Sequence, residues 1–391
     1  MKRALLAVAI AACSSPPRTT TPHTELGAGA AEPDAVRRKR LVAELQDEIL
    51  SSYERDDLPD IETQMIPASV GPSRIGVGPG DVLNGDDVRQ RASSRWPLYL
   101  GNDVLTEVRS KHLDIHLSAD KQVTAAWMSD EVSWRITVCG HVAVMPLRIT
   151  ALYAHDGDRW VQVLEHLSFG AVPEATPELY GLEVKSAVVD RALADELSRT
   201  LAPVLYRQTS RLPQVVWLDP DHKAEDNISA PAPTMLISPD SEGEWHGTED
   251  VGHAQLVDGT LTPEDRRIGT IGPGVGRSTI AYWAGNFVAD LPDRPGVKGG
   301  KVRLRGTFVF EKRKAGQQGP ADCTDPKADC HWYVVQGHVS KPVDDINLAS
   351  IVFGTALLSE KPLAVTCDDG RRAPTVPAAA PTTSTPAAGS P

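Results

Sequence analysis

A tryptophan, a histidine and a serine recur at one spacing in two places of the 391-residue chain. The histidine lies six residues after the tryptophan and the serine eight residues after it, in Trp160, His166 and Ser168 and again in Trp332, His338 and Ser340. Because imidazole titrates near neutral pH and can act as a general base, His166 and His338 are the candidate catalytic residues. The recurrence also indicates that part of the chain has been duplicated.

Residues around both motifs extend them into a candidate ligand pocket. An arginine stands in an alternating run ahead of each motif, and residues 126–127 (Ala-Trp) align with residues 282–283 (Tyr-Trp). Because side chains alternate along a strand, Trp160, His166 and Ser168 are expected to share one face. Such a pocket would suit an amphipathic or carboxylate-bearing ligand. Its candidate residues are Trp127, Arg148, Trp160, His166, Trp283, Arg305, Trp332 and His338.

The same residues have a structural alternative. Tryptophans that carry a pattern are more often core residues, so Trp160 and Trp332 could pack beneath a helix. The two histidines would then hydrogen-bond the backbone at the rim of a sheet. The sequence does not pair either histidine with an acid, because Asp87 and Asp250 recur just after a glycine turn and could cap a helix.

Metal and nucleotide chemistry find little support. His112, Asp114 and His116 lie on one face of a predicted strand, but the sequence identifies no third and fourth ligand, so a solvated face is favoured over a zinc site. The glycine-rich segment 269–278 lacks the phosphate-loop pattern. We therefore expect no metal and no cofactor. A formal net charge of −12 also argues against nucleic acid as a partner.

The chain begins like an exported lipoprotein. Lys2 and Arg3 precede a short apolar run, and residues 10–13 (Ile-Ala-Ala-Cys) resemble the bacterial lipobox. This predicts a signal peptide over 1–12 and acyl chains such as palmitate on Cys13, with anchoring in the cell envelope. Ser14 after the cysteine is typical of outer-membrane sorting in Gram-negative bacteria. An ordinary secretory signal is the alternative.

Composition divides the rest of the chain. Residues 13–34 read as a tether and residues 371–391, rich in Pro, Ala and Thr, as a disordered tail. Two domains are expected between them, over 35–172 and 182–360. Each begins with a helical pattern, over 36–53 and 183–206, and continues into alternating strands, which predicts an α+β fold.

The cysteines after Cys13 allow one local pairing to be predicted. Cys323 and Cys330 lie within one loop of an exported chain and are expected to form a disulfide. Cys139 and Cys367 either pair with each other or remain free thiols, and the sequence leaves both possibilities open.

Several segments together resemble the SnoaL-like, nuclear-transport-factor-2-like superfamily over most of 36–172 and 183–345. They are AWMSDEVSW (126–134), the strand ending in EHLS (165–168), EGEWHGTEDV (242–251), IAYWAGNFV (280–288) and HWYVVQGHVS (331–340). The resemblance implies two cone-shaped domains, each a curved antiparallel sheet wrapped by N-terminal helices around a pocket. Because members of this superfamily often dimerise through their sheets, two copies in one chain imply an internal pseudo-dimer.

Three functions are compatible with these features. The favoured one is a non-catalytic envelope lipoprotein that binds a small apolar or amphipathic ligand, or an envelope protein. The first alternative is an isomerase- or hydrolase-like enzyme that uses a pocket histidine. The second is a purely structural envelope protein, in which the second domain closes the sheet of the first.

Overall fold

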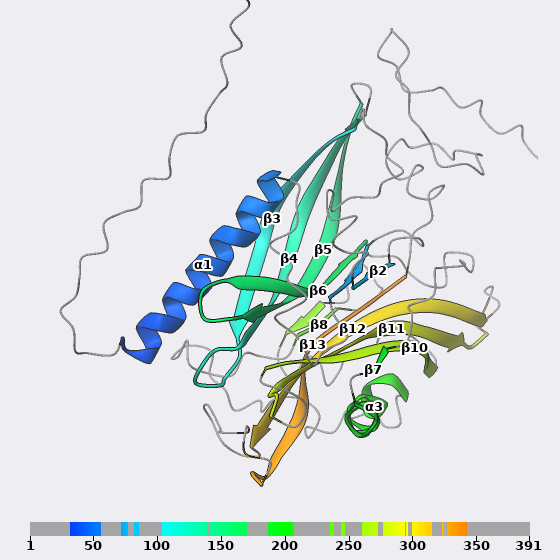
Figure 1. The fold of residues 1–391 in the computed structure, drawn as a ribbon. Helices are drawn as coiled ribbons and strands as arrows, with labels where there is room; N and C mark the ends of the chain where they lie inside the picture. The colour runs from blue at the N-terminus through cyan, green and yellow to red at the C-terminus, as the bar shows by residue number, and fades with distance from the viewer. Residues whose placement is uncertain are drawn as a thin grey trace, which may run out of the picture.

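A computed structural model describes two β-sheets with few helices, in an α+β arrangement (Figure 1). Cys13, Cys139, Cys367, Asp87, Asp250 and the predicted tail lie outside the described residues. The described residues are 32–55, 72–76, 82–85, 104–138, 141–169, 187–188, 190–206, 235–237, 244–246, 260–272, 277–293, 295, 299–314, 323, 325 and 327–341.

The described residues of the first half form one helix and a six-stranded sheet in the order β2-β1-β6-β5-β4-β3. Its elements are α1 (Asp34–Arg55), β1 (Ser73–Ile75), β2 (Val82–Asn84), β3 (Val104–Leu117), β4 (Ala125–Val138), β5 (His141–His155) and β6 (Trp160–Ser168).

In the second half, the residues that the structure describes form one helix and a seven-stranded sheet in the order β7-β10-β11-β12-β13-β8-β9. Its elements are β7 (Ala187–Val188), α3 (Arg191–Tyr206), β8 (Met235–Ile237), β9 (Glu244–His246), β10 (Thr260–Ile271), β11 (Ile280–Leu291), β12 (Gly300–Lys314) and β13 (Cys330–Ser340).

Each helix covers one face of its own sheet. Leu41, Leu45 and Ile49 recur every four residues along α1 and are buried against strands of the first sheet. Leu197 and Leu201 do the same on α3 against the second sheet. Figure 1 shows α1 along β3 and α3 beside β10.

The second helix begins later than the sequence pattern predicted. The expected helix over 183–206 starts at Arg191, and residues 187–188 form β7, which pairs with β10. The carboxylate of Asp190 accepts the N–H of Leu193 at 2.8 Å, and its carbonyl accepts the N–H of Ala194. Asp190 is therefore the N-cap that fixes this start.

Both sheets are mixed, whereas the resemblance implied antiparallel sheets. β1 pairs parallel with β6, and β8 pairs parallel with β13, while each consecutive pair from β3 to β6 and from β10 to β13 is antiparallel. Short hairpins, β1–β2 and β8–β9, thus lie beside the last long strand of each half. The two halves share this order of pairing.

The registers of the two halves agree residue by residue. Ile75 lies opposite His166 in the first sheet, and Ile237 lies opposite His338 in the second. The antiparallel neighbour of the histidine is Thr150 in one sheet and Thr307 in the other. The long strands also shift register at equivalent places, after Leu152 in β5 and after Val309 in β12.

Buried apolar side chains form three clusters. One joins α1 to the first sheet and one joins α3 to the second sheet. The third contains no helical residue and draws on both sheets, so the sheet faces turned away from the helices are in contact. Its members from the first half are Ile75, Ala125, Trp127, Leu152, Ala154, Val163 and Leu164, and from the second Ile271, Ile280, Tyr282, Ala284, Val309 and Val335.

Neither α1 nor α3 combines the length and the apolar character that a bilayer crossing requires, and no other helix is described.

Candidate functional site

A β-bulge decides which way the candidate histidines point. In β6 the pairing with β5 skips Val163, so Val163 and Leu164 both face the second sheet. Trp160, which precedes the bulge, packs against α1, whereas His166 contacts the second half. The prediction that Trp160 and His166 share one face is therefore wrong, because an extra residue in a strand inverts the alternation beyond it.

The second motif repeats this arrangement. The pairing of β13 with β12 skips Val335, which joins the cluster between the sheets. Trp332 lies before the bulge and packs in the cluster under α3, while His338 lies beyond it and reaches the first half. Both histidines thus sit between the sheets.

Four hydrogen bonds connect the histidines to hydroxyl groups of the opposite half. His166 bonds Ser340 and Thr307, and His338 bonds the equivalent Ser168 and Thr150. The distances are 2.7 Å for His166 Nε2 to Ser340 Oγ, 3.1 Å for His166 Nδ1 to Thr307 Oγ1, 2.7 Å for His338 Nε2 to Ser168 Oγ and 2.9 Å for His338 Nδ1 to Thr150 Oγ1. Each contact therefore has a counterpart with the halves exchanged.

The two imidazole rings also stack on each other. Their centroids are 3.8 Å apart and their planes differ by 18°, with both side chains fully buried. Burial lowers the pKa of His166 well below its usual value, and the positive charges of Arg305 and Arg148 lower it further. Burial, His166 and Arg148 lower the pKa of His338 in the same way. Both rings are consequently neutral at pH 7.

A neutral imidazole suits these partners. Each ring offers one N–H donor and one acceptor nitrogen, and each hydroxyl can donate or accept, so both tautomers are satisfied. Two protonated rings at this separation would repel by about 4 kcal/mol at the effective dielectric of a protein. The arrangement therefore stabilises the neutral pair.

The two candidate arginines lie on the same faces as the histidine partners. Arg148 is the β5 neighbour of Ser168, and Arg305 is the β12 neighbour of Ser340. Both are buried, and Arg305 Nη1 donates to the carbonyl oxygen of Gly76 at 3.3 Å, again from one half to the other. Their positive charges border the histidine pair.

The remaining tryptophan candidates, Trp127 and Trp283, lie in different clusters. Trp127 lies in the cluster between the sheets, and Trp283 lies under α3 with Phe287 and Phe308. By strand register the counterpart of Trp127 is Tyr282. Trp127 pairs with Leu152, two residues after Thr150, and Tyr282 pairs with Val309, two residues after the equivalent Thr307. The alignment of 126–127 with 282–283 is thus shifted by one residue, which places Trp283 on the opposite face.

The structure therefore brings four of the eight pocket candidates together, and all eight are buried. His166, His338, Arg148 and Arg305 meet between the sheets, while Trp160 and Trp332 fill the helix-side cores. The imidazole nitrogens form their hydrogen bonds with hydroxyl groups of the protein itself. This geometry joins two halves of the chain and leaves both imidazole rings fully buried.

Sequence reasoning missed a buried acid. Asp130 lies on the helix-facing side of β4, and its Oδ1 accepts from Ser110 Oγ at 3.1 Å and from the N–H of His112 at 3.2 Å. Burial raises the pKa of Asp130, while these bonds and one from Tyr53 oppose the rise. Because β3 bulges between Ser110 and His112, the carboxyl satisfies backbone groups that the bulge frees. A lone acid between Met128 and Val132 is the signal that could have revealed it.

On the predicted His112 strand face, His112 is exposed and Asp114 partly exposed, whereas His116 is half-buried, with its ring centroid 6.4 Å from that of Trp127. His112 and Asp114 form a pair, with 3.3 Å between Nε2 and Oδ2. Among the described residues, no three side chains of His, Cys, Asp or Glu are grouped so that they could hold a metal ion.

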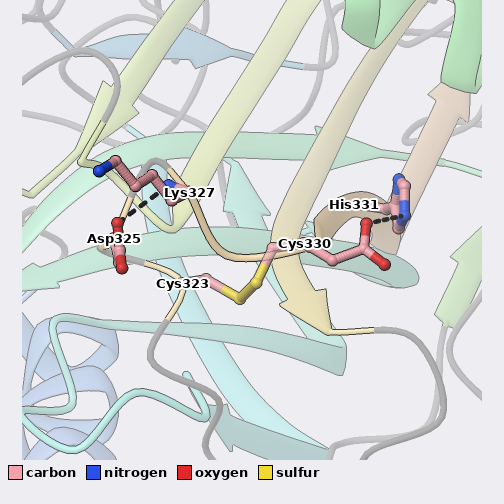
Figure 2. The surroundings of a disulfide bond; sticks show 6 residues. Cys323, Asp325, Lys327, Cys330 and His331 are labelled. Atoms are coloured by element: carbon pink, nitrogen blue, oxygen red, sulfur yellow. Dashed lines mark hydrogen bonds and ion pairs between the residues drawn. A yellow bond between two sulfur atoms is a disulfide. The ribbon is translucent and has the colours of Figure 1, made fainter.

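The predicted disulfide is confirmed. Cys323 and Cys330 are bonded at the start of β13, with their Cα atoms 5.9 Å apart (Figure 2). Within the loop, Asp325 accepts the N–H of Lys327 at 2.9 Å, and His331 bonds Asp329.

Comparison with known proteins gives matches among solved structures alone. No family model matches the chain, and no curated protein matches it. An NTF2-like superfamily protein from Salmonella enterica is 15% identical, covers 34% of this chain and 91% of its own, and has a TM-score of 0.27. An NTF2-like family protein from Streptomyces avermitilis is 16% identical over 33% of this chain and 96% of its own, at a TM-score of 0.26.

A further similar structure is the association domain of C. elegans CaMKII. It is 14% identical, with 35% of this chain and 99% of that domain covered and a TM-score of 0.24. Solved structures similar to part of this chain thus include NTF2-like superfamily proteins.

Proposed function

We propose that this protein is a non-catalytic lipoprotein of the bacterial cell envelope, anchored through Cys13 and sorted to the outer membrane. The observation that supports a non-catalytic role is the state of the two candidate imidazoles. Both are fully buried, and both nitrogens of each ring bond hydroxyl groups of the other half. A general base must reach a proton of its substrate, and these rings could do so only if the sheets separated.

The two halves are proposed to be tandem SnoaL-like domains, over 35–172 and 182–360, packed as an internal pseudo-dimer. The exchange of equivalent partners between His166 and His338 supports this arrangement. In an interface with two-fold symmetry, residue i contacts j and the equivalent of j contacts the equivalent of i. A duplicated chain can retain such an interface within one molecule.

Among the non-catalytic roles, the placement of the tryptophans favours a structural one at this interface. Trp160 and Trp332 fill space under α1 and α3 that a pocket would need. An apolar ligand or an envelope protein, the other non-catalytic possibility, would then bind at a surface that the eight candidate residues do not form. The isomerase or hydrolase alternative needs a pocket histidine, and neither of its two candidates, His166 and His338, is exposed.

The N-terminal features support the anchor. The charged start, the short apolar run and the lipobox-like residues before Cys13 are the recognition elements of lipoprotein export. If residues 13–34 act as a flexible linker, their typical end-to-end reach is about 25 Å, which keeps the folded body close to the membrane surface.

Replacing Cys13 tests the anchor directly. In the native host, we expect Cys13→Ala to abolish incorporation of labelled palmitate and to release the protein from the membrane fraction. Cys139→Ala serves as the control and should remain membrane-bound and labelled. Normal processing of Cys13→Ala with unchanged membrane association would overturn the lipoprotein assignment.

The non-catalytic proposal is tested by native mass spectrometry of protein isolated from envelope extracts. We expect the mass of the chain with its acyl groups alone, because the candidate pocket is filled. A small molecule bound at one per chain and lost on His166→Gln would contradict the structural interpretation. A molecule retained by His166→Gln would place binding at another surface and support the ligand-binding role.

A further inference from the structure

We propose that His166 and His338 form a proton-sensitive latch, so that mild acidification separates the two sheets while each half keeps its own core. The inference rests on the face-to-face packing proposed above. It adds a conformational device to that packing, with the stacked imidazole pair as the element that senses protons.

The latch depends on how the rings are held. Each ring sits against the other at 3.8 Å and is bonded at both nitrogens by hydroxyl groups from the opposite half. The contact between the sheets is therefore stable only while both rings are neutral. If both were protonated, two imidazolium ions would face each other at this distance with no water between them. Separation of the sheets would hydrate both rings and remove the repulsion.

Charged groups around the rings make their protonation in the closed state still less favourable, which strengthens the dependence of sheet separation on pH. The charges that lower the pKa of His166 are those of Arg305 and Arg148, and those that lower the pKa of His338 are the charges of Arg148 and of His166 once it is protonated. The same contact contains Glu311, which is paired with Arg313 and accepts the N–H of Ala119 from the first half at 2.6 Å. The described groups that face the rings are Arg148 and Thr150 of β5, Ser168 of β6, Arg305 and Thr307 of β12, Ser340 of β13 and, by register, Ile75 of β1.

The three separate clusters allow the response to be local. The cluster under α1 draws only on the first half, and the cluster under α3 only on the second. Separation of the sheets would expose the third cluster alone, including Trp127 and Tyr282. Each half would keep its helix, its sheet and the core between them.

Two neighbouring alanines provide matched probes for this opening. Ala125 and Ala126 are adjacent in β4 and equally buried, but Ala125 faces the second sheet and Ala126 faces α1. We would introduce Ala125→Cys or Ala126→Cys into the full-length chain and label with 4,4′-dithiodipyridine between pH 7.5 and 5.5. Peptide mass spectrometry reads each position separately, and rates are normalised to the unfolded chain at each pH.

If the latch exists, the labelling rate of Ala125→Cys should rise as the pH falls, while Ala126→Cys should remain protected. Because each ring takes up one proton on opening, the ratio of open to closed molecules increases by up to about 10-fold per pH unit for each histidine. His166→Gln with His338→Gln should remove this dependence, and His338→Gln alone should halve its slope on a logarithmic scale. His112→Gln, on the exposed strand face, is the control and should leave the slope unchanged.

Three outcomes would count against the account, and they are distinguishable. Equal labelling at positions 125 and 126 as the pH falls would show global unfolding and overturn the latch. An unchanged slope in His338→Gln would overturn the role of the histidines. Labelling of position 125 at pH 7.5 as fast as in the unfolded chain would refute the packing of the two halves itself, and with it the pseudo-dimer.

Discussion

At the scale of single residues, the histidines are best explained as a buried neutral pair. The recurrence of Trp, His and Ser is visible in the sequence, but residue spacing carries no information on which groups these side chains meet. Partners such as His166 and Ser340 are 174 positions apart, so the contact depends on how two sheets pack. Asp130 was missed for the same reason, since its partners lie on other elements.

Replacing His166 by Leu should be much more harmful than replacing it by Gln. The Leu variant leaves two buried hydroxyls, Thr307 and Ser340, without their partner, and we expect a loss of about 2 to 4 kcal/mol in the free energy of unfolding. Gln retains a donor and an acceptor and should lose about 1 kcal/mol. Urea unfolding measures both, with His112→Leu as an exposed control that stays within about 0.5 kcal/mol.

Stability should fall with decreasing pH below about 6.5, the usual pKa of histidine in an unfolded chain. The pKa of each buried ring is lower when folded, so the unfolded chain binds more protons as the pH falls from about 6.5 toward the folded pKa. The slope is at most about 1.4 kcal/mol per pH unit for each ring. Urea midpoints that are flat between pH 7.5 and 5.5 would contradict the burial of these groups.

At the scale of elements, apolar periodicity predicted the first helix and the alternating strands, and it predicted the second helix with a start that is too early. The stripe of Leu41, Leu45 and Ile49 is visible in the sequence, as is the run in α3. The bulges were not predictable, because the skipped Val163 and Val335 look like ordinary strand residues. One skipped residue reverses every side chain beyond it, which is why Trp160 and His166 were assigned to one face.

Close packing of strands can be tested at Gly306 in β12. An added Cβ there would clash with the ring of Phe287, which is fully buried in the cluster under α3. We expect Gly306→Ala to lower the free energy of unfolding by about 1 to 3 kcal/mol. Gly300→Ala, in the same strand and with open space at its Cβ, should change it by less than about 0.5 kcal/mol. Equal effects in thermal melts would disprove the contact.

At the scale of the whole molecule, the central feature is the contact between the two sheets. Both halves repeat one order of pairing, and equivalent residues exchange partners across the contact. The recurring motif predicted two similar halves, and the described strands of both halves share one order of pairing. The way in which the two halves meet could not be predicted, because it depends on the bulges and on which sheet face each helix leaves uncovered.

A double-mutant cycle between His166 and Ser340 tests this contact most directly. These residues lie in different halves, with 2.7 Å between Nε2 and Oγ. Urea unfolding of His166→Leu, Ser340→Ala and the double variant should give a coupling energy between about 0.5 and 3 kcal/mol. The pair His112→Leu with Ser340→Ala should be additive within about 0.5 kcal/mol. Additivity for His166 and Ser340 as well would contradict the packing of the two halves.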